Sequence, residues 1–186
     1  MSLGNKTTIL PPMLSTFLLV LLVLIITIYS IYTLVPVLFF HSAPYIRSNK
    51  ARINTMLELA DIKPGMRVID IGSGDGEICL HAAKRGANAL GIELNPFLVL
   101  LSRIRSRTLG VSHQTRFVSK NFWQFKLPIE TDVVLCYLRP HVMQELWPKL
   151  IADLHPGTII ISNSFYIPQV EPEKEKDGVM RYRIPE

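Results

Sequence analysis

Apolar residues are distributed unevenly along this chain, and the densest run lies near the N-terminus. Residues 10–40 include no charged side chain, and residues 17–28 are almost entirely leucine, valine and isoleucine. A helix needs about 20 such residues to cross a bilayer, and a buried soluble helix is rarely apolar on every side. The pattern therefore predicts a membrane anchor over residues 13–40, with Pro36 kinking or ending its helix.

A cleaved signal peptide is the competing interpretation of this run. The apolar core of a signal peptide usually has about 7–15 residues, and a small-x-small cleavage site follows it, which is not clear here. Lys6 is the only basic side chain before the run, whereas Arg47, Lys50 and Arg52 follow it closely. The positive-inside rule then places the C-terminal domain in the cytoplasm, or in the mitochondrial matrix of a eukaryote.

After the apolar run, short apolar segments alternate with stretches of helical periodicity, separated by turn and cap signals such as Asn95-Pro96. This alternation indicates an α/β fold with an open, mostly parallel, Rossmann-like sheet. We expect helices over 53–60, 78–83, 96–109 and 140–154, and strands over 68–71, 88–93, 115–118, 132–137, 158–162 and 180–184.

Details of three segments complete this expectation. The helix that begins at Pro140 is expected to be interrupted at Pro148. Residues 168–178 are charged and rich in proline, which predicts a loop. The expected organisation is a polar N-terminus (1–12), the transmembrane helix (13–40), a juxtamembrane linker (41–48) and the α/β domain (49–186). On the helix over 96–109, four apolar residues share one side: Phe97, Leu100, Leu101 and Ile104.

Composition limits the possible cofactors and compartments. With 186 residues, the chain has room for one domain of ordinary size and an appendage. Its two cysteines, Cys79 and Cys136, fall in a predicted helix and a predicted strand, so we interpret both as core residues in a reducing compartment. No pair of histidines or cysteines has the spacing of a metal site, and no metal is expected.

The strand over 68–71 runs into a turn with glycines at alternate positions, Asp70-Ile71-Gly72-Ser73-Gly74-Asp75-Gly76. A strand, a glycine-rich turn and the start of a helix together form a nucleotide-binding corner. The dinucleotide fingerprint G-x-G-x-x-G is the competing pattern, but here the third glycine comes one residue early. Asp70 and Glu93, which ends the next strand, add acids to this corner.

With these acids and glycines, the sequence resembles the class I S-adenosylmethionine-dependent methyltransferases. The resemblance implies that Asp70 helps to place the amino group of the cofactor, and that Glu93 accepts hydrogen bonds from the two ribose hydroxyls. It implies that Leu94 and Asn95 flank the adenosine and that Asn121 and Phe122 lie at the adenine, where many family members have an aspartate. The turn implied to pass under the methionine part consists of Gly72, Ser73, Gly74, Asp75 and Gly76.

A closer resemblance covers most of the chain. The apolar run, Asp-Ile-Gly-Ser-Gly-Asp-Gly-Glu (70–77), Gly-Ile-Glu-Leu-Asn-Pro (91–96) and Leu-x-Pro (138–140) occur together in one group. They are similar to the small membrane-anchored protein-lysine methyltransferases that modify mitochondrial ATP synthase or the adenine nucleotide translocase, and to their prokaryotic relatives. This resemblance implies a protein-lysine N-methyltransferase acting on a membrane or membrane-associated protein, and it does not name the target.

Methyl transfer requires a deprotonated amine held in line with the methyl group. The ends of the fourth and fifth strands lie beside the cofactor in such a sheet, and there Tyr137 and Asn163 carry suitable groups. Tyr137 would orient the amine or accept its proton, and Asn163 would hold it. The structural alternatives are that Tyr137 packs over the cofactor and that Asn163 caps a turn.

Positive charge is concentrated between Glu93 and Glu130, where six basic residues occur without an acid: Arg103, Arg105, Arg107, Arg116, Lys120 and Lys126. A solvated helix face is one interpretation. The other is contact with anionic lipid headgroups through Arg103, Arg105 and Arg107. Nucleic-acid binding is disfavoured, because no recognisable nucleic-acid module is present.

Two other functions are compatible with these features. An anchored methyltransferase could modify a lipid amine or a lipophilic small molecule, since a tether serves any substrate held in the bilayer. A cofactor-binding protein without catalysis could serve as a membrane-bound assembly factor. Labelled methyl groups entering protein, lipid or neither would separate the three functions.

Overall fold

The computed structural model describes residues 11–40 and 49–186, and it divides into two compact units, Met1–Pro44 and Tyr45–Glu186. The predicted linker, residues 41–48, lies outside the described residues, as does most of the predicted polar N-terminus. Each unit is therefore considered by itself.

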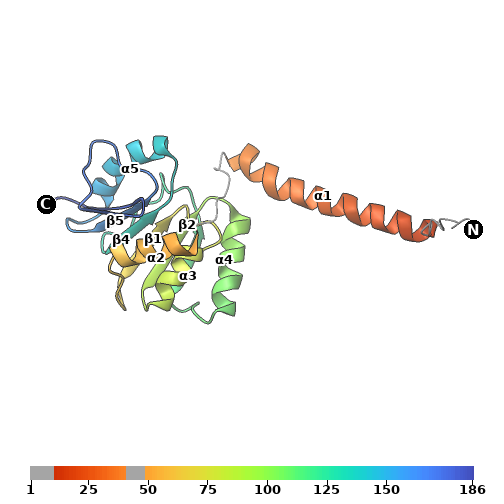
Figure 1. The fold of residues 1–186 in the computed structure, drawn as a ribbon, viewed down its shortest axis with the longest axis horizontal. Helices are drawn as coiled ribbons and strands as arrows, with labels where there is room; N and C mark the ends of the chain where they lie inside the picture. The colour runs from red at the N-terminus through yellow and green to blue at the C-terminus, as the bar shows by residue number, and fades with distance from the viewer. Residues whose placement is uncertain (1–10, 41–48) are drawn as a thin grey trace, which may run out of the picture. The chain divides into compact units, whose positions relative to one another are not determined.

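The first unit is a single helix, α1 (Pro12–Phe40), of 29 residues (Figure 1). Its segment Pro12–Ser30 has a mean hydropathy of 2.5, which makes it long and apolar enough to be a candidate membrane span. The helix continues to Phe40, so it does not end at Pro36, which was one of the two outcomes predicted for that proline. A proline removes one internal hydrogen bond, and a long helix can continue past that loss.

The second unit contains a seven-stranded sheet, in the order β3-β2-β1-β4-β5-β7-β6. Strands β1 to β5 are mutually parallel and β7 runs antiparallel to β5, which confirms the mostly parallel α/β fold. The strands are β1 (Arg67–Ile71), β2 (Asn88–Glu93), β3 (Thr115–Ser119), β4 (Val133–Cys136), β5 (Ile159–Asn163), β6 (Lys174–Lys176) and β7 (Val179–Arg183).

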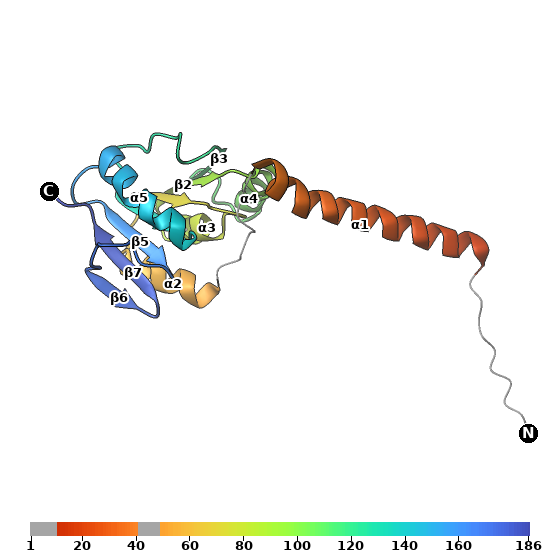
Figure 2. The same ribbon diagram turned by 90° about the horizontal axis from the view of Figure 1, so that it is seen from above.

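Helices cover the two faces of this sheet unequally (Figure 2). One face carries α2 (Lys50–Leu59), α3 (Glu77–Lys84) and α4 (Pro96–Thr108), and the other carries α5 (Pro140–Asp153). Residues 120–132 join β3 to β4 without a helix, although a right-handed crossover usually contains one. The domain is thus kept small by leaving out the helix between these two strands.

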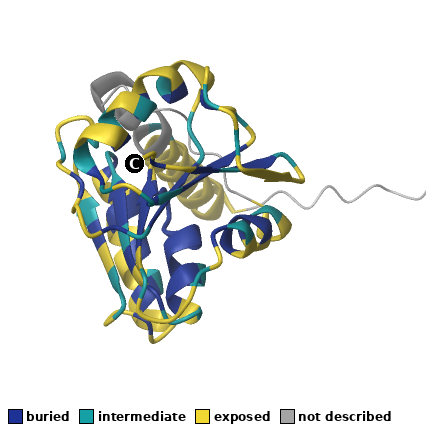
Figure 3. Ribbon diagram, turned by 90° about the vertical axis from the view of Figure 1, so that its left-hand side faces the viewer, coloured by how far each residue is buried: buried dark blue, intermediate teal, exposed yellow. Residues whose placement is uncertain are grey.

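Two apolar cores lie on opposite sides of the sheet, because successive side chains of a strand point to opposite faces. In β4, Val133 and Leu135 belong to the core under α2 and α3, whereas Val134 and Cys136 belong to the core under α5. The inner strands are accordingly mostly buried while the outer sides of the helices are exposed (Figure 3). Cys79 and Cys136 are both fully buried free thiols, which confirms their interpretation as core residues.

Two segments differ from the sequence prediction. Helix α5 passes through Pro148 without interruption, because the proline lies on its exposed side and only one hydrogen bond is lost. The charged segment predicted as a loop contains the short edge strand β6, whose three residues are all exposed. Charged side chains suit such an edge, since they protect it from pairing with another chain. Lys176 of β6 pairs with Glu58 of α2 at 3.0 Å.

Helix α4 also packs differently from what its apolar periodicity suggests. Its buried residues are Leu98, Val99, Ser102 and Ser106. The side that carries Phe97, Leu100, Leu101 and Ile104 is 40–56% exposed.

Replacing Pro148 by alanine is expected to stabilise the second unit by about 1–2 kcal/mol. The substitution restores a helix amide, and part of this gain is offset by the greater freedom of the unfolded chain. Denaturant unfolding of the full chain in detergent micelles would measure the change. Pro140→Ala is the matched control, because a proline at the first position of a helix costs nothing. Equal effects of the two substitutions would contradict the account.

Candidate active site

The glycine turn (residues 72–76) begins directly at the carboxyl end of β1. Its three glycines all have positive φ angles, between 54° and 78°, a region that glycine occupies without strain. The amides of Gly72 and Ser73 both donate to the carbonyl of Ile92, at 2.8 and 3.1 Å. The turn is therefore fastened to the end of the neighbouring strand β2.

There is little room around the glycines of this corner. A Cβ atom on Gly72 would lie 3.1 Å from Leu138, and one on Gly76 would lie 2.8 Å from Phe117. Gly91, in β2, is more confined still, with Phe117 at 2.5 Å from its added Cβ. The corner can be assembled only because these positions lack side chains.

Ser73 occupies an unusual position within the turn. Its hydroxyl oxygen is buried and has no hydrogen-bond partner among the described residues. Buried polar groups are nearly always paired, so an orphan of this kind marks a place where a bound molecule can supply the partner.

Glu93 ends β2 with its carboxylate held at both oxygens. Oε2 accepts from the amide of Gly74 at 3.0 Å, and Oε1 accepts from the amide of Asn95 at 2.8 Å. Each oxygen keeps a second lone pair for another donor. Asn95 is the N-cap of α4, since its side chain accepts from the amide of Phe97 at 2.9 Å. Leu94 lies between them, and its carbonyl accepts from the Ser119 hydroxyl at 3.2 Å.

Asp70, at the centre of the corner, is only 1% exposed. Burial is the largest cause that raises its pKa, to about 8, and the negative charges of Glu93 and Asp75 add to the effect. The thiol of Cys79 donates to its carboxyl group at 3.9 Å between sulfur and oxygen. The carboxyl therefore stays protonated at neutral pH until something cationic comes close to it.

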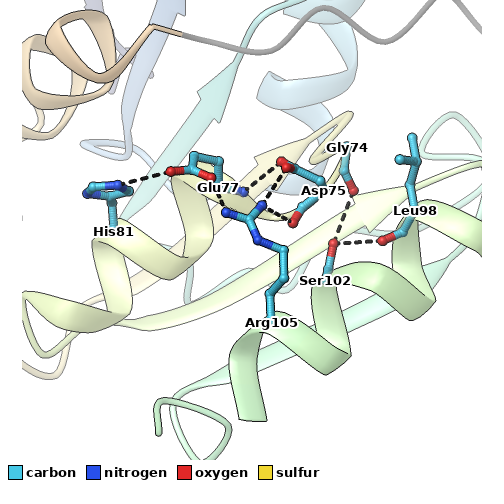
Figure 4. Close-up of polar contacts among 7 residues, drawn as sticks. All are labelled: Gly74, Asp75, Glu77, His81, Leu98, Ser102 and Arg105. Atoms are coloured by element: carbon cyan, nitrogen blue, oxygen red, sulfur yellow. Dashed lines mark hydrogen bonds and ion pairs between the residues drawn. The ribbon is translucent and has the colours of Figure 1, made fainter. Parts of the chain in front are cut away.

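Asp75 and Glu77 are joined to α4 through Arg105 (Figure 4). The guanidinium lies 2.5 Å from the Asp75 carboxylate, donates to the Asp75 carbonyl at 2.9 Å and also pairs with Glu77. In the same contact region, the hydroxyl of Ser102 lies 3.1 Å from the carbonyl of Gly74. This cluster clamps the glycine turn and the start of α3 onto α4.

The clamp changes the interpretation of the arginines on α4. Arg105 is neutralised by two carboxylates within the protein, so the expectation that it contacts lipid headgroups is wrong. Arg103 donates through Nε and Nη2 to the carbonyl of Phe117, at 3.2 and 2.7 Å, and its side chain lies over the edge strand β3. Arg107 is exposed.

Asn121 and Phe122 follow β3, beside the end of β2. The side chain of Asn121 accepts from the amide of Trp123 at 3.0 Å and thereby caps a turn. Phe122 packs against the core under α5 and lies 4.5 Å, between ring centroids, from Trp123. The amide of Lys120 donates to the carbonyl of Glu93 at 3.0 Å, which keeps this loop next to the corner.

Tyr137 directly follows strand β4, and Asn163 is the last residue of the adjacent strand β5. The ring of Tyr137 lies nearly parallel to that of Phe165, with 6.3 Å between centroids and 17° between planes. Asn163 is 3% exposed, and its side-chain oxygen accepts from the Ser164 hydroxyl at 3.1 Å. Leu138, next to Tyr137, is the residue that approaches Gly72, so the end of β4 reaches the glycine turn.

Comparison with known proteins identifies this arrangement. The family described as the ANTKMT methyltransferase domain matches residues 70–174, more than half of the chain. A protein-lysine N-methyltransferase of Saccharolobus islandicus is 32% identical over 146 residues, covering 76% of this chain and 90% of the relative. The chain belongs to this family of S-adenosylmethionine-dependent methyltransferases.

Other relatives of this methyltransferase differ in length or in their described substrate. The adenine nucleotide translocase lysine N-methyltransferase of Mus musculus is 35% identical over 130 residues. The match covers 69% of this chain and 56% of that relative. A lysine N-methyltransferase of Xenopus laevis, named for an ATP synthase component, is 36% identical over 130 residues. The match covers 70% of this chain and 57% of that relative, so the chain spans little more than half the length of both relatives.

A solved structure from the same group of enzymes resembles the fold closely. The crystal structure of an RNA methyltransferase from Salinibacter ruber, in complex with S-adenosylhomocysteine, is 35% identical with a TM-score of 0.73. That match covers 76% of this chain and 95% of the other.

Several residues that shape the corner were not among the expected site residues. Leu138 belongs to the Leu-x-Pro motif at the end of the fourth strand, and this motif is the signal that could have identified it. Phe117, Ser102 and Arg105 come from β3 and α4, and no local spacing connects them to residues 72–76. Their contribution depends on how α4 folds back over the turn, which is a tertiary contact.

Replacing Arg105 by methionine is expected to destabilise the methyltransferase unit by about 1–3 kcal/mol. The substitution leaves the nearly buried carboxylates of Asp75 and Glu77 without their cation, and the partly exposed position of the arginine moderates the loss. Thermal unfolding of the full chain in detergent would measure it. Arg107→Met is the matched control on the exposed side of α4. Equal melting temperatures for the two variants would contradict the role of the clamp.

Replacing Asp70 by asparagine is expected to make the stability of the ligand-free protein less dependent on pH. Asp70 keeps its proton up to about pH 8 in the folded state and loses it near pH 4 when unfolded. The wild-type protein therefore loses stability as pH rises between about 4 and 8, by at most ~1.4 kcal/mol per pH unit from this group.

Denaturant unfolding of both proteins from pH 5 to pH 8 would measure the difference, which should grow in favour of Asp70→Asn. Asp132→Asn, at a carboxylate directly before β4, provides the control. Parallel stability curves for Asp70→Asn and the wild type would contradict a protonated Asp70.

Proposed function

We propose that this chain is a protein-lysine N-methyltransferase that modifies a membrane or membrane-associated protein. The single observation that carries the proposal is the acidic corner around the glycine turn, where Asp70 and Glu93 lie beside backbone with no room for side chains. A cofactor with a sulfonium and an ammonium group suits such a corner electrostatically, whereas a phosphate does not.

Four groups of the corner fit this cofactor. The second lone pairs of the Glu93 carboxylate would accept from the ribose hydroxyls. Asp70 would face the cationic methionine part, and the orphan hydroxyl of Ser73 would gain a partner there. The backbone of Gly72 and Gly74 would form the floor under the cofactor. Leu94, Asn95, Asn121 and Phe122 remain proposed neighbours of the adenosine.

Asp75 and Gly76 support the cofactor less directly. The contacts of Asp75 with Arg105 and with the amide of Glu77, at 3.3 Å, make it a residue that holds the turn in shape. Gly76 allows Phe117 and Ser102 to approach the turn closely. We therefore assign both residues a positioning role.

The chemistry on the substrate side is simple. S-adenosylmethionine supplies an electrophilic methyl group on a sulfonium. The lysine amine must lose a proton and approach with its lone pair aligned, because only the free amine can form the new N–C bond. Tyr137 would orient this amine through its hydroxyl, and Asn163 would hold it with its side-chain oxygen. The parallel rings of Tyr137 and Phe165 would shield the amine from water.

The choice of a lysine in a membrane protein has two supports. Relatives at 32–35% identity are named lysine methyltransferases, of the adenine nucleotide translocase in Mus musculus and of proteins in Saccharolobus islandicus. Helix α1 contains a candidate membrane span, and a tether raises the local concentration of any substrate in the same membrane. The flanking charges favour a domain on the cytoplasmic side, or the matrix side of a mitochondrion.

RNA methylation is the second candidate, favoured by the described activity of the Salinibacter ruber protein, which is 35% identical over most of its length. Exposed basic residues near β3, such as Arg116 and Lys120, are compatible with it. Lipid-amine methylation is the third candidate, because a tethered enzyme also meets lipid headgroups. The three differ in which molecule receives the methyl group.

The test is to incubate the full chain in lipid vesicles with S-adenosylmethionine labelled in its methyl group and with a membrane extract, total RNA and soluble protein. We expect the label in membrane protein, resistant to ribonuclease and lipid extraction, and released by hydrolysis as methylated lysine. Label in RNA, in lipid or in none of these would contradict the proposal.

Three variants sharpen this assay. Glu93→Ala should lower the affinity for the cofactor and the transfer of label by at least about tenfold, since two charge-assisted hydrogen bonds are lost. Glu130→Ala, an exposed acid paired with Arg67 at 3.6 Å, should leave both unchanged. Tyr137→Phe should lower turnover at saturating cofactor without changing cofactor affinity, and an unchanged rate would remove its hydroxyl from the mechanism.

A further inference from the structure

Helix α4 presents an apolar surface to the outside of the methyltransferase unit. Four large side chains at helical spacing, three or four residues apart, form it, and each is 40–56% exposed: Phe97, Leu100, Leu101 and Ile104. The opposite side of the helix, with Leu98 and Ser102, packs on the sheet and the glycine turn. A continuous apolar patch of this kind is uncommon on a protein surface without a partner.

The charges that border this surface differ on its two sides. On one side, Arg105 is neutralised by the carboxylates of Asp75 and Glu77. On the other, towards the edge strand β3, Arg103 and Arg107 lie on the helix.

Strand β3 runs along that side, with Phe117 facing α4 and the alternating residues Arg116 and Val118 on the opposite face of the sheet. Arg103 reaches the carbonyl of Phe117 in the same strand, which shows that this flank of the helix faces β3. The sequence contains no acid between Glu93 and Glu130. The exposed border is therefore purely cationic.

We propose that the outer face of α4 docks on the surface of an anionic lipid bilayer. The four apolar side chains enter the boundary between headgroups and acyl chains, and the cations towards β3 contact lipid phosphates. An apolar stripe with a basic margin is the arrangement by which interfacial helices bind anionic membranes. A protein partner would more commonly place polar groups of both signs around such a patch.

The linker between α1 and α2 is short, which keeps this contact within reach. Only nine residues, 41–49, separate the end of α1 from the start of α2, and a chain of that length spans at most about 30 Å. When α1 lies in a bilayer, the methyltransferase unit stays within this distance of the same bilayer. Docking of a tethered surface costs less entropy than binding from solution.

The contact also has a consequence for the cofactor corner. Phe97 comes two residues after the N-cap Asn95, whose amide holds the Glu93 carboxylate. The apolar surface therefore begins close to the adenosine side of the proposed site. Docking through α4 would present this end of the sheet to the membrane, where the proposed substrate is found. The inference uses the tether but does not depend on lysine as the acceptor.

The experiment places an environment-sensitive fluorophore at Ile104→Cys in the full chain, reconstituted in vesicles that carry a quencher on the lipid acyl chains. The native thiols of Cys79 and Cys136 are fully buried and do not compete for the label. Ile151→Cys is the matched control, because Ile151 is an isoleucine of similar exposure, 45%, on the other side of the sheet, in α5.

In vesicles with about one third anionic lipid, we expect quenching at position 104 and little quenching at position 151. Neutral vesicles, or the substitution Arg107→Gln, should weaken quenching at position 104, with about a fivefold change in the docking equilibrium for each lost cation. Equal quenching at both positions, or none at position 104, would overturn the proposal. A concentration-dependent blue shift at position 104 without lipid quenching would also overturn it, in favour of a second copy covering the face.

This readout requires no methyl transfer. Failure of the labelling assay with intact quenching would refute the proposed acceptor and leave the docking surface standing. Label in membrane-protein lysine without quenching at position 104 would refute the docking surface and leave the proposed acceptor standing.

Discussion

The attachment of the glycine turn to the carboxyl end of β2 is the constraint on which the site depends. One carbonyl, that of Ile92, accepts two amides of the turn, and the Glu93 carboxylate accepts a third. These bonds hold the turn at the carboxyl end of β1, and it is between β1 and β4 that the strand order reverses and leaves a crevice in open α/β sheets. Most residues proposed to touch the cofactor lie at this junction, on the turn itself, at Glu93 or on the segment that follows it.

Helix α4 supports this junction through the side chains on its inner side. Arg105 and Ser102 hold the turn and the start of α3, while Phe117 fills the space that the missing side chains of Gly76 and Gly91 leave open. The inner side of the helix thus serves the cofactor corner. Its outer side is apolar, with an exposed basic border towards β3. A single short helix therefore connects the geometry of the site with the surface proposed to meet the membrane.

The sequence predicted the succession of strands and helices along the chain and the nature of the corner because both depend on local signals. The bounds of β2 were predicted to the residue, and the Asn95-Pro96 start of α4 was confirmed in atomic detail. The failures involve contacts that no local pattern encodes. The predicted interruption at Pro148 was wrong, since the exposure of this proline was not visible in the sequence, and β6 was missed because an edge strand need not be apolar.

The same limit applies to the candidate site. Glu93, Asp70 and the glycines could be placed by motif, and the structure brings them together. Arg105 looked like one of a set of surface cations, since nothing in residues 103–107 reveals that Asp75 and Glu77 lie opposite. The apolar side of α4 was visible as periodicity, yet periodicity cannot distinguish a face that packs on a sheet from a face that remains exposed.

The position of Asp75 has a consequence for which ligands the corner excludes. The amino end of a helix behind a glycine turn usually attracts phosphate, because its free amides and its dipole favour an anion. Here the Asp75 carboxylate accepts from the Glu77 amide at 3.3 Å, so α3 carries its own anion at that end. The phosphates of ATP and of dinucleotides would approach a helix end at which the Asp75 carboxylate already lies. A phosphate at this corner would therefore have to compete with the Asp75 side chain for the Glu77 amide at the start of α3.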